Sequence, residues 1–479
     1  MGHRLTGLGL ALSLANIPIA GAQETPAAWD PTPWIEDLAQ VREAIDQKYA
    51  NLEWLTQERE VPLDKGFAQI EAAVKRAGSD AAARAAFDRL VERIGDGHVR
   101  LRWKAPASTA PAASGGLCAR LGYNGRQVRA GTAATLPGYR AIDSGPFAAG
   151  LVASGGTRIG VVRIGVFDPH GYPVLCEAAA AAEALAPDAP CDEVCADRIV
   201  THAYAAMTRG LATTLARLKA EGAETLLVDI ADNGGGSEWT ETAARMLSAR
   251  TLTSASTAFV RGPHWARIWG DLGARLLGFA ANERGADKAR LLAWAAQAES
   301  AQREAQTPCE RSTGCSRIVK AAYATGLVGD ARQGAFAGKP WGVHVFNPAQ
   351  IPYVQGAWDG PLVVLTDGET WSAAEQFAAL LQDNKAAVVL GGRTGGAGCG
   401  YSWGGSPTTL RHSGAVLQLP DCVRFRADGS NEVRGVIPDI LSGARPTDGS
   451  KLRAALTAAK LDEAVVRARA LHAATSGMR

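Results

Sequence analysis

The sequence has little net charge and, beyond its first residues, no long apolar run. Its 479 residues include 50 lysines and arginines and 48 aspartates and glutamates, which gives a formal charge of +2. A nearly neutral chain of this size gives no indication of a nucleic-acid partner or an acidic surface. No segment after residue 22 is apolar over the roughly 20 residues that a transmembrane helix needs. We therefore expect no nucleic-acid partner and no membrane span, and the sequence has no signal for an oligomeric state.

Ligand patterns for metals and nucleotides are also missing. Cys191 and Cys195 have only His202 nearby, which is not the clustered spacing of a zinc site. The glycine-rich run DIADNGGG at 229–236 lacks the lysine and the spacing of a nucleotide-binding loop. The sequence therefore predicts neither a metal nor a cofactor.

The first 22 residues predict export. Arg4 precedes an apolar stretch at 5–19, and small residues follow at 20–22. This is the pattern of a secretory signal peptide, which is removed from the mature protein. The stretch is short for a membrane anchor and is interrupted by Asn16 and Pro18. We therefore expect a secreted or periplasmic protein.

The cysteines support the same compartment. Their number is even, and cysteines of an exported protein meet an oxidising environment in which they usually pair. The eight positions are 118, 176, 191, 195, 309, 315, 399 and 422. We expect several disulfides, with Cys309–Cys315 and Cys399–Cys422 as the preferred local pairs, although eight cysteines allow about 105 pairings.

The segment at 23–104 predicts a small helical N-terminal domain. Apolar residues repeat at helical spacing at Leu63, Phe67, Ile70 and Val74 and at Phe87, Leu90, Val91 and Ile94. An earlier helix is expected from about Pro33. Gly95 is a plausible helix end, after which the alternation of Val99, Leu101 and Trp103 predicts a strand.

The rest of the chain alternates strands with helices. Buried strands are predicted at 158–167, 225–230, 361–365 and 387–390, and helices at 211–218, 239–247 and 372–381. This order predicts an α/β core with parallel pairing, in which functional residues gather at the carboxyl ends of strands. We expect the core at 156–447, insertions at 168–205 and 250–345 that could act as lids, a linker or small β segment at 105–155, and a C-terminal helix at 448–479.

A serine that follows a predicted strand and starts a helix is the first candidate for chemistry. At such a turn Ser372 meets the positive helix end and free backbone N–H groups, and the N–H of Ala373 is a natural oxyanion donor. Serine needs a base beside it to act as a nucleophile. The alternative is structural, because the run from Ser372 to Glu375 also matches a helix capping box.

Two further segments could complete such a site. The glycines of 229–236 follow a strand and allow backbone N–H groups to approach a substrate, although the run could also be an ordinary turn. His98 comes directly after the third helix and could act as a base, although a lone histidine is usually structural.

The order of these motifs resembles that of a known superfamily. The motifs are GDGH at 95–98, VDIADNGGG at 228–236, TWSAAE at 370–375, GRTG at 392–395 and GVIPD at 435–439. Together they resemble the tail-specific (C-terminal-processing) proteases, the tricorn core protease and the interphotoreceptor retinoid-binding protein. The resemblance covers most of the chain outside the two insertions, and it implies a ClpP/crotonase-like core and a peptide or protein substrate.

The resemblance also distinguishes between two catalytic types. Tail-specific proteases use a Ser-Lys dyad, and the position that matches their lysine is Ala397 in TGGAG at 394–398. Lys385 belongs to a helix-to-strand turn, so we expect it on the surface. The dyad therefore looks absent. The tricorn-like type uses a histidine and a glutamate, and His98 and Glu432 fill these positions.

The implied site is thus Ser372 as nucleophile, His98 as general acid and base, and Glu432 orienting the imidazole. By the same resemblance, the oxyanion hole combines the N–H groups of Ala373 and Gly235, with residues 234 and 236 left open. The tricorn type has a serine before its histidine, whereas this chain has Gly97. A fourth catalytic residue is therefore left unassigned.

These features predict a serine-type peptidase that hydrolyses peptide bonds of exported proteins or peptides through an acyl-enzyme. The alternative is a non-catalytic ligand- or peptide-binding member of the same fold. An esterase of the α/β-hydrolase type is disfavoured because the Gly-x-Ser-x-Gly motif is missing around Ser372. Only about fifty residues separate Trp103 from the strand at 158–167, so we expect no complete PDZ domain.

Overall fold

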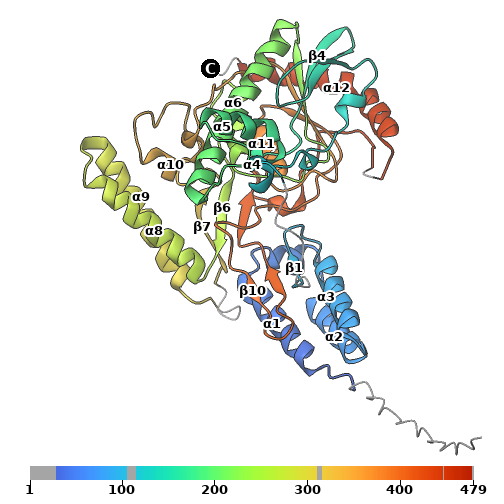
Figure 1. The fold of residues 1–479 in the computed structure, drawn as a ribbon, viewed down its shortest axis with the longest axis vertical. Coiled ribbons are helices and arrows are strands. Elements are labelled where there is room, and N and C mark those ends of the chain that lie inside the picture. The colour runs from blue at the N-terminus through green and yellow to red at the C-terminus, as the bar shows by residue number, and fades with distance from the viewer. Residues whose placement is uncertain (1–27, 105–114, 310–314, 446, 477–479) are drawn as a thin grey trace, which may run out of the picture.

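The computed structural model describes residues 28–104, 115–309, 315–445 and 447–476. Figure 1 shows an upper body that contains the largest sheet, a lower arm of N-terminal helices, and a long helical hairpin at one side. The expected signal peptide at 1–22 and residues 105–114 of the expected linker lie outside the described residues. Within the described ranges, no helix is both long and apolar enough to cross a bilayer.

Three helices form the lower arm, as their apolar spacing predicts. They are α1 (Thr32–Lys48), α2 (Leu63–Lys75) and α3 (Asp80–Ile94). Ser79 caps α3 by accepting a hydrogen bond from the N–H of Ala82, and Gly95 ends the helix in the left-handed conformation at φ 64°. His98 therefore lies just beyond a well-defined helix end.

A small antiparallel sheet completes the arm with residues from much later in the chain. Its strands are β1 (Arg100–Arg102), β11 (Val416–Gln418) and β10 (Thr408–Thr409). Leu417 of β11 packs in one apolar cluster with Phe87 of α3. The arm thus includes a segment that lies within the predicted core at 156–447.

The largest sheet has seven strands in the order β13-β9-β8-β5-β4-β3-β2. Their bounds are β2 (Arg140–Ile142), β3 (Ala149–Ser154), β4 (Thr157–Arg163), β5 (Thr225–Asp229), β8 (Leu362–Thr366), β9 (Val388–Gly391) and β13 (Ile440–Leu441). The five strands from β13 to β4 run parallel, and β3 and β2 extend the sheet antiparallel. The predicted α/β core with parallel pairing is confirmed, and the carboxyl ends of β5 and β8 lie side by side.

Helices cover both faces of this sheet because alternate residues of a strand point to opposite sides. Leu226 and Val228 of β5 pack in the cluster that contains residues of α6 (Glu193–Ala220), α7 (Trp239–Met246) and α11 (Ala373–Asp383). Leu227 packs on the other face in the cluster of α12 (Ser450–Ser476), the predicted C-terminal helix. Buried helices on both sides hold the strand ends in fixed positions.

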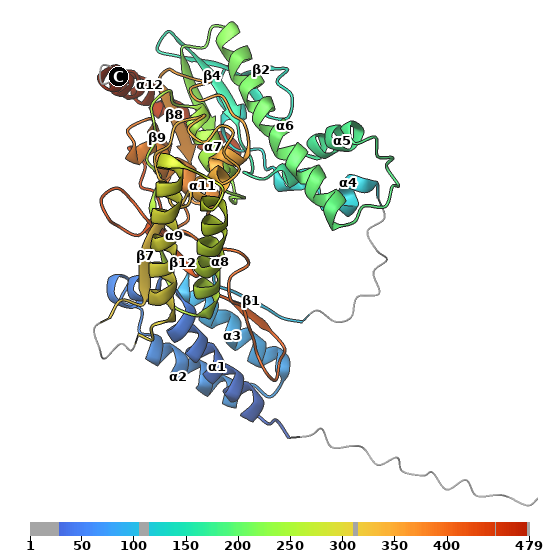
Figure 2. The same ribbon diagram turned by 90° about the vertical axis from the view of Figure 1, so that its left-hand side faces the viewer.

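The segment at 168–205 is more continuous with the core than the sequence predicts. It contains α5 (Pro173–Ala182), but α6 begins at Glu193 and runs without a break to Ala220. The expected end of the insertion at 205 therefore falls inside one helix. Figure 2 shows α5 and the short α4 (Leu117–Arg120) beside the first half of α6.

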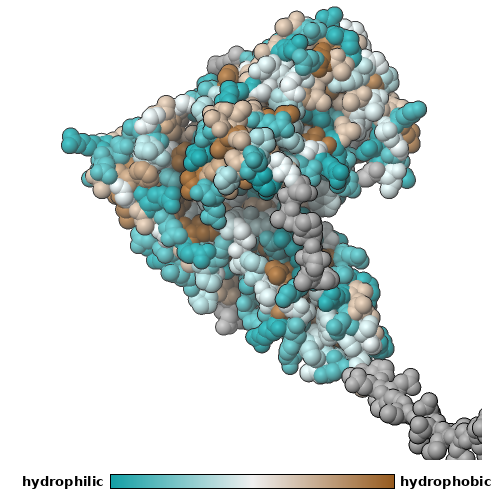
Figure 3. Space-filling model, in the orientation of Figure 1, coloured by the Kyte–Doolittle hydropathy of each residue, from teal (hydrophilic) through white to brown (hydrophobic). Residues whose placement is uncertain are grey.

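The segment at 250–345 forms a second antiparallel sheet and a hairpin. Its elements are β6 (Ser256–Val260), α8 (Pro263–Ala280), α9 (Gly285–Gln306), β7 (Ile318–Tyr323) and α10 (Gly342–Val345). β6 pairs with both β7 and β12 (Cys422–Phe425), and α8 and α9 lie side by side in Figure 2. The surface in Figure 3 is hollowed between the upper body and the arm, and its hydrophobic residues form small separate groups.

All eight cysteines form disulfides. The pairs are Cys118–Cys176, Cys191–Cys195, Cys309–Cys315 and Cys399–Cys422. Both expected local pairs are confirmed. Of the other two pairs, Cys118–Cys176 joins α4 to α5, and Cys191–Cys195 links the first turn of α6 to the residues before it.

Candidate active site

Ser372 lies between the end of β8 and the start of α11, at a turn with an unusual backbone. Its φ of 56° is in the left-handed region, where a residue other than glycine is strained. The preceding residues hold the turn: the N–H of Trp371 donates to the carbonyl of Asn233 at 2.9 Å, and the hydroxyl of Thr370 donates to the carbonyl of Ile230 at 3.0 Å. The nucleophile candidate is thus attached to the loop that follows β5.

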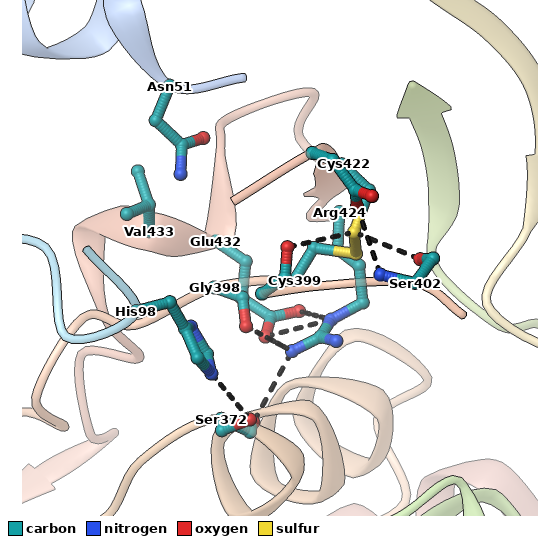
Figure 4. Close-up of a disulfide and its surroundings, with 12 residues drawn as sticks. Asn51, His98, Ser372, Gly398, Cys399, Ser402, Cys422, Arg424, Glu432 and Val433 are labelled. Atoms are coloured by element: carbon teal, nitrogen blue, oxygen red, sulfur yellow. Dashed lines mark hydrogen bonds and ion pairs between the residues drawn. A yellow bond between two sulfur atoms is a disulfide. The ribbon is translucent and has the colours of Figure 1, made fainter. Parts of the chain in front are cut away.

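His98 meets this serine from the arm. Its Nε2 lies 3.1 Å from Oγ of Ser372 (Figure 4). Its Nδ1 lies 2.8 Å from the carbonyl oxygen of Ala397. A carbonyl only accepts, so Nδ1 carries the proton and Nε2 is free to accept from the hydroxyl. Burial lowers the pKa of His98 to about 4, the bond to Ala397 opposes this, and the charges of Arg424 and Arg100 add to it. The imidazole is therefore neutral near pH 7, as a general base must be.

Asp96 holds the backbone of the histidine. Its Oδ1 accepts from the N–H of His98 at 2.9 Å, while Oδ2 accepts from the hydroxyl of Tyr49 at 2.9 Å and from Nδ2 of Asn51 at 3.0 Å. Burial raises the pKa of Asp96 to about 6, against these three hydrogen bonds. Residues of the arm therefore fix the position of the base.

The loop after Gly398 closes over the other side of the imidazole. Tyr401 donates its hydroxyl proton to the carbonyl of His98, and the two rings meet edge to face with centroids 5.5 Å apart. A Cβ on Gly400 would lie 2.9 Å from Nε2, so only glycine allows this loop to pass so close to the ring. The disulfide Cys399–Cys422 ties the loop to β12.

Glu432 makes no hydrogen bond to the imidazole, which differs from the role that the resemblance implies. Its buried carboxylate accepts from Arg424 of β12, at 3.0 Å from Nε and 2.6 Å from a terminal nitrogen (Figure 4). The same guanidinium donates to the carbonyls of Gly398 at 2.8 Å and Ser372 at 3.3 Å. The acceptor that orients His98 is instead the carbonyl of Ala397, because the turn at 394–398 brings it to Nδ1.

The two expected oxyanion donors differ in their environment. Ala373 is the first residue of α11, where N–H groups have no partner within the helix. The N–H of Gly235, in contrast, donates to Oδ1 of Asn233 at 2.8 Å, so it is already engaged. Gly235 does lie against the nucleophile, since a Cβ there would be 2.8 Å from Cβ of Ser372. Of the expected pair, only Ala373 is placed to donate in this geometry.

The glycine before His98 has a steric explanation that the sequence did not reveal. A Cβ on Gly97 would lie 2.2 Å from Cζ3 of Trp371, and one on Gly395 would lie 2.5 Å from Cε2 of the same ring. The indole thus fills the space between the two glycines. Trp371 occupies the place where a side chain at position 97 would lie.

Contacts bear on two other sequence-based alternatives. The capping box is formed, because the N–H of Ser372 donates to Oε2 of Glu375 at 2.9 Å and the Ser372 side chain accepts from the backbone of Glu375, and the hydroxyl also lies 3.1 Å from Nε2 of His98. Lys385 is exposed in the turn after α11, at the end of the helix opposite Ser372, as expected for a surface residue. Ala397, at the position of the dyad lysine, provides no base.

Comparisons with known proteins agree with this architecture. The model of Peptidase family S41 matches residues 198–442, which is about half of the chain. No curated protein matches the sequence. Mature CPAF is similar in structure with a TM-score of 0.58 and 14% identity over 91% of this chain and 98% of its own. CPAF complexed with lactacystin gives a TM-score of 0.56 and 14% identity over 90% and 97%. These likenesses show the shared fold, and the family match shows that the chain belongs to Peptidase family S41, a family of serine-type peptidases.

Proposed function

We propose that this chain hydrolyses peptide bonds of exported proteins or peptides through an acyl-enzyme at Ser372, with His98 as general base and acid. The observation that supports this most is the hydrogen bond between Oγ and Nε2 at 3.1 Å, with Nδ1 held by a carbonyl. This places a neutral base beside a hydroxyl at a helix start, which is the arrangement that serine hydrolases need.

The steps follow from these positions. Nε2 of His98 takes the hydroxyl proton as Oγ of Ser372 attacks the substrate carbonyl, and the N–H of Ala373 donates to the oxyanion. The imidazolium keeps its bond to the carbonyl of Ala397 and gives its proton to the leaving amine, which leaves the acyl-enzyme. Water then attacks the ester with the same base. Glu432 acts at a distance, by holding the guanidinium of Arg424 against the carbonyl of Ser372.

The disulfides support the exported location. Four pairs, two of them between sites 58 and 23 residues apart, are typical of proteins that fold in an oxidising compartment. A non-reducing peptide map of protein purified from culture medium and periplasm should recover the four pairs. Recovery of reduced cysteines from a purely cytoplasmic pool would contradict this location.

Labelling with a fluorophosphonate probe tests the mechanism. The wild-type protein should be labelled at Ser372, and the S372A variant should lose both labelling and peptide hydrolysis, by roughly a millionfold for turnover. The H98A variant should lose labelling while keeping its fold. Peptide cleavage by S372A at the wild-type rate would refute the proposed nucleophile.

A further inference from the structure

Glu375 has four hydrogen-bond donors around one buried carboxylate. Oε1 accepts from the hydroxyl of Thr394 at 2.7 Å and from the N–H of Gly396 at 2.7 Å. Oε2 accepts from the N–H of Ser372 at 2.9 Å and from the N–H of Ala397 at 2.8 Å. The side chain is fully buried. An ordinary helix cap needs only the first-turn bond to the N-cap, so the three bonds to 394–397 need another explanation.

These bonds join the two segments whose spacing decides the geometry of the site. One segment contains the nucleophile, because Glu375 holds the N–H of Ser372. The other is the turn at 394–397, and the carbonyl of Ala397 is the acceptor for Nδ1 of His98. One carboxylate therefore fixes both the backbone of the nucleophile and the residue that orients the base.

The carboxylate of Glu375 differs from that of Glu432 in its charged partners. Glu432 is neutralised by Arg424, whose guanidinium makes a bidentate contact with it. The four donors at Glu375 are all neutral groups. Among the described residues, no cationic group donates a hydrogen bond to Glu375, and Arg424 interacts with it only through space, where the charge of Glu375 helps to raise the pKa of Arg424.

We propose that Glu375 is a positioning residue for the peptidase reaction, which locks the turn at 394–397 and the backbone of Ser372 into the geometry that His98 needs. This inference rests on the proposed function, because it assumes that Ser372 and His98 react. It assigns to Glu375, by way of the Ala397 carbonyl, the orienting task that the resemblance gives to Glu432.

The protonation of Glu375 offers a readout that a purely structural role would not change. Burial raises its pKa to about 7 against the hydrogen bond from Thr394, and the charge of Glu432 raises it further. Other charged groups around the site are Arg424 of β12, Arg100 of β1 and His98, whose pKa burial lowers to about 4. Below about pH 7 a proton on Glu375 would displace one of its four donors. The decrease in kcat/KM at acid pH, its acid limb, should therefore follow the protonation of Glu375 rather than that of His98.

The decisive variant is E375Q in the full-length protein, measured with a fluorogenic peptide and a fluorophosphonate probe. Its amide offers only one accepting oxygen, so two of the donors lose their partner. We expect kcat to fall on the order of a hundredfold, as for other misplacements near 1 Å, with KM within about twofold. The acid limb of the residual activity should move at least about one pH unit lower, toward that of His98.

The matched variant is T394V, which keeps the carboxylate but removes one donor to it, together with the acceptor of the Val436 N–H. It should lower kcat by about threefold to tenfold and move the acid limb to higher pH, because the hydrogen bond from Thr394 lowers the pKa of Glu375. A folded E375Q protein with the wild-type kcat and the wild-type acid limb overturns the inference. If E375Q fails to fold, a wild-type kcat of T394V overturns it. Full activity of S372A would instead refute the proposed function, whatever E375Q shows.

Discussion

The contact between Gly97 and Trp371 allows a sharp test of how the arm and the core fit together. In G97A the new Cβ would lie 2.2 Å from Cζ3 and 2.5 Å from Cε3 of the indole. Carbon atoms in contact are separated by about 3.5 Å or more, so one side must move by roughly 1.3 Å. Gly97 has no left-handed φ, so the effect is steric and not a matter of backbone strain.

The ring has no room to retreat, because Gly395 lies against its other edge at a distance that already excludes a Cβ. The displacement must therefore reach Ser372, which follows Trp371, or His98, which follows Gly97. A shift of about 1 Å between reacting groups costs roughly a hundredfold in rate. We expect kcat/KM of G97A to fall by about that factor in a peptide-hydrolysis assay, with a smaller change in thermal stability.

The control is G278A, because a Cβ at this helical glycine of α8 meets nothing within 4 Å. It should leave kcat/KM unchanged and stabilise the protein by up to about 1 kcal/mol. A double-mutant cycle with W371A isolates the clash: in the W371A background the added methyl group should cost little. Wild-type activity of G97A, or an equal loss in both backgrounds, would refute the steric argument.

Three further predictions concern the surroundings of the site. D96N should lower the free energy of unfolding by about 2 kcal/mol and also lower kcat, because an amide cannot accept from all three groups that donate to Asp96, one of which is the N–H of His98; urea unfolding and peptide hydrolysis would show both. Replacing Cys399 and Cys422 with serine should cost about 3 kcal/mol in the same unfolding assay, and an unchanged midpoint would contradict a stabilising role for this pair. Burial raises the pKa of Asp421 from 3.8 to about 7, so its protonated form stabilises the fold at low pH and this stability is lost as the pH rises through 7. In the wild-type protein the free energy of unfolding should therefore be lower at pH 8 than at pH 5, and D421N should make this difference smaller by about 3 kcal/mol.

The helices and strands that the sequence predicts correctly share one property. Each has an apolar pattern that local chemistry already determines, such as the spacing in α2 or the buried run of β5. The two-residue and three-residue strands β10 and β11 have no such pattern. They exist because Leu417 completes the cluster of the arm, and a contact between residues over three hundred positions apart has no local signal.

The candidate site also contains some parts that local sequence patterns predict and others that depend on distant contacts. Ser372 and His98 could be predicted because both are side chains at element ends, within motifs whose order is specific. The acceptor for Nδ1 could not, because it is a backbone carbonyl and any residue has one. Glu432 was predicted to orient the imidazole because its position matches the motif, but its partner Arg424 lies on a strand whose place depends on the pairing with β6.

The residue at position 397 allows a test of the proposed mechanism against the Ser-Lys dyad. By the resemblance, tail-specific proteases of the dyad type have a lysine base at this position. Here the side chain is a buried alanine, and the carbonyl of the same residue accepts from the base instead. The A397K variant would bring an ammonium group toward a site that already contains Arg424, and burial with like charge would lower the pKa of this ammonium group and of His98. We therefore expect A397K to lose activity rather than gain a dyad, and a measured kcat above the wild-type value would show that this turn can still support the other mechanism.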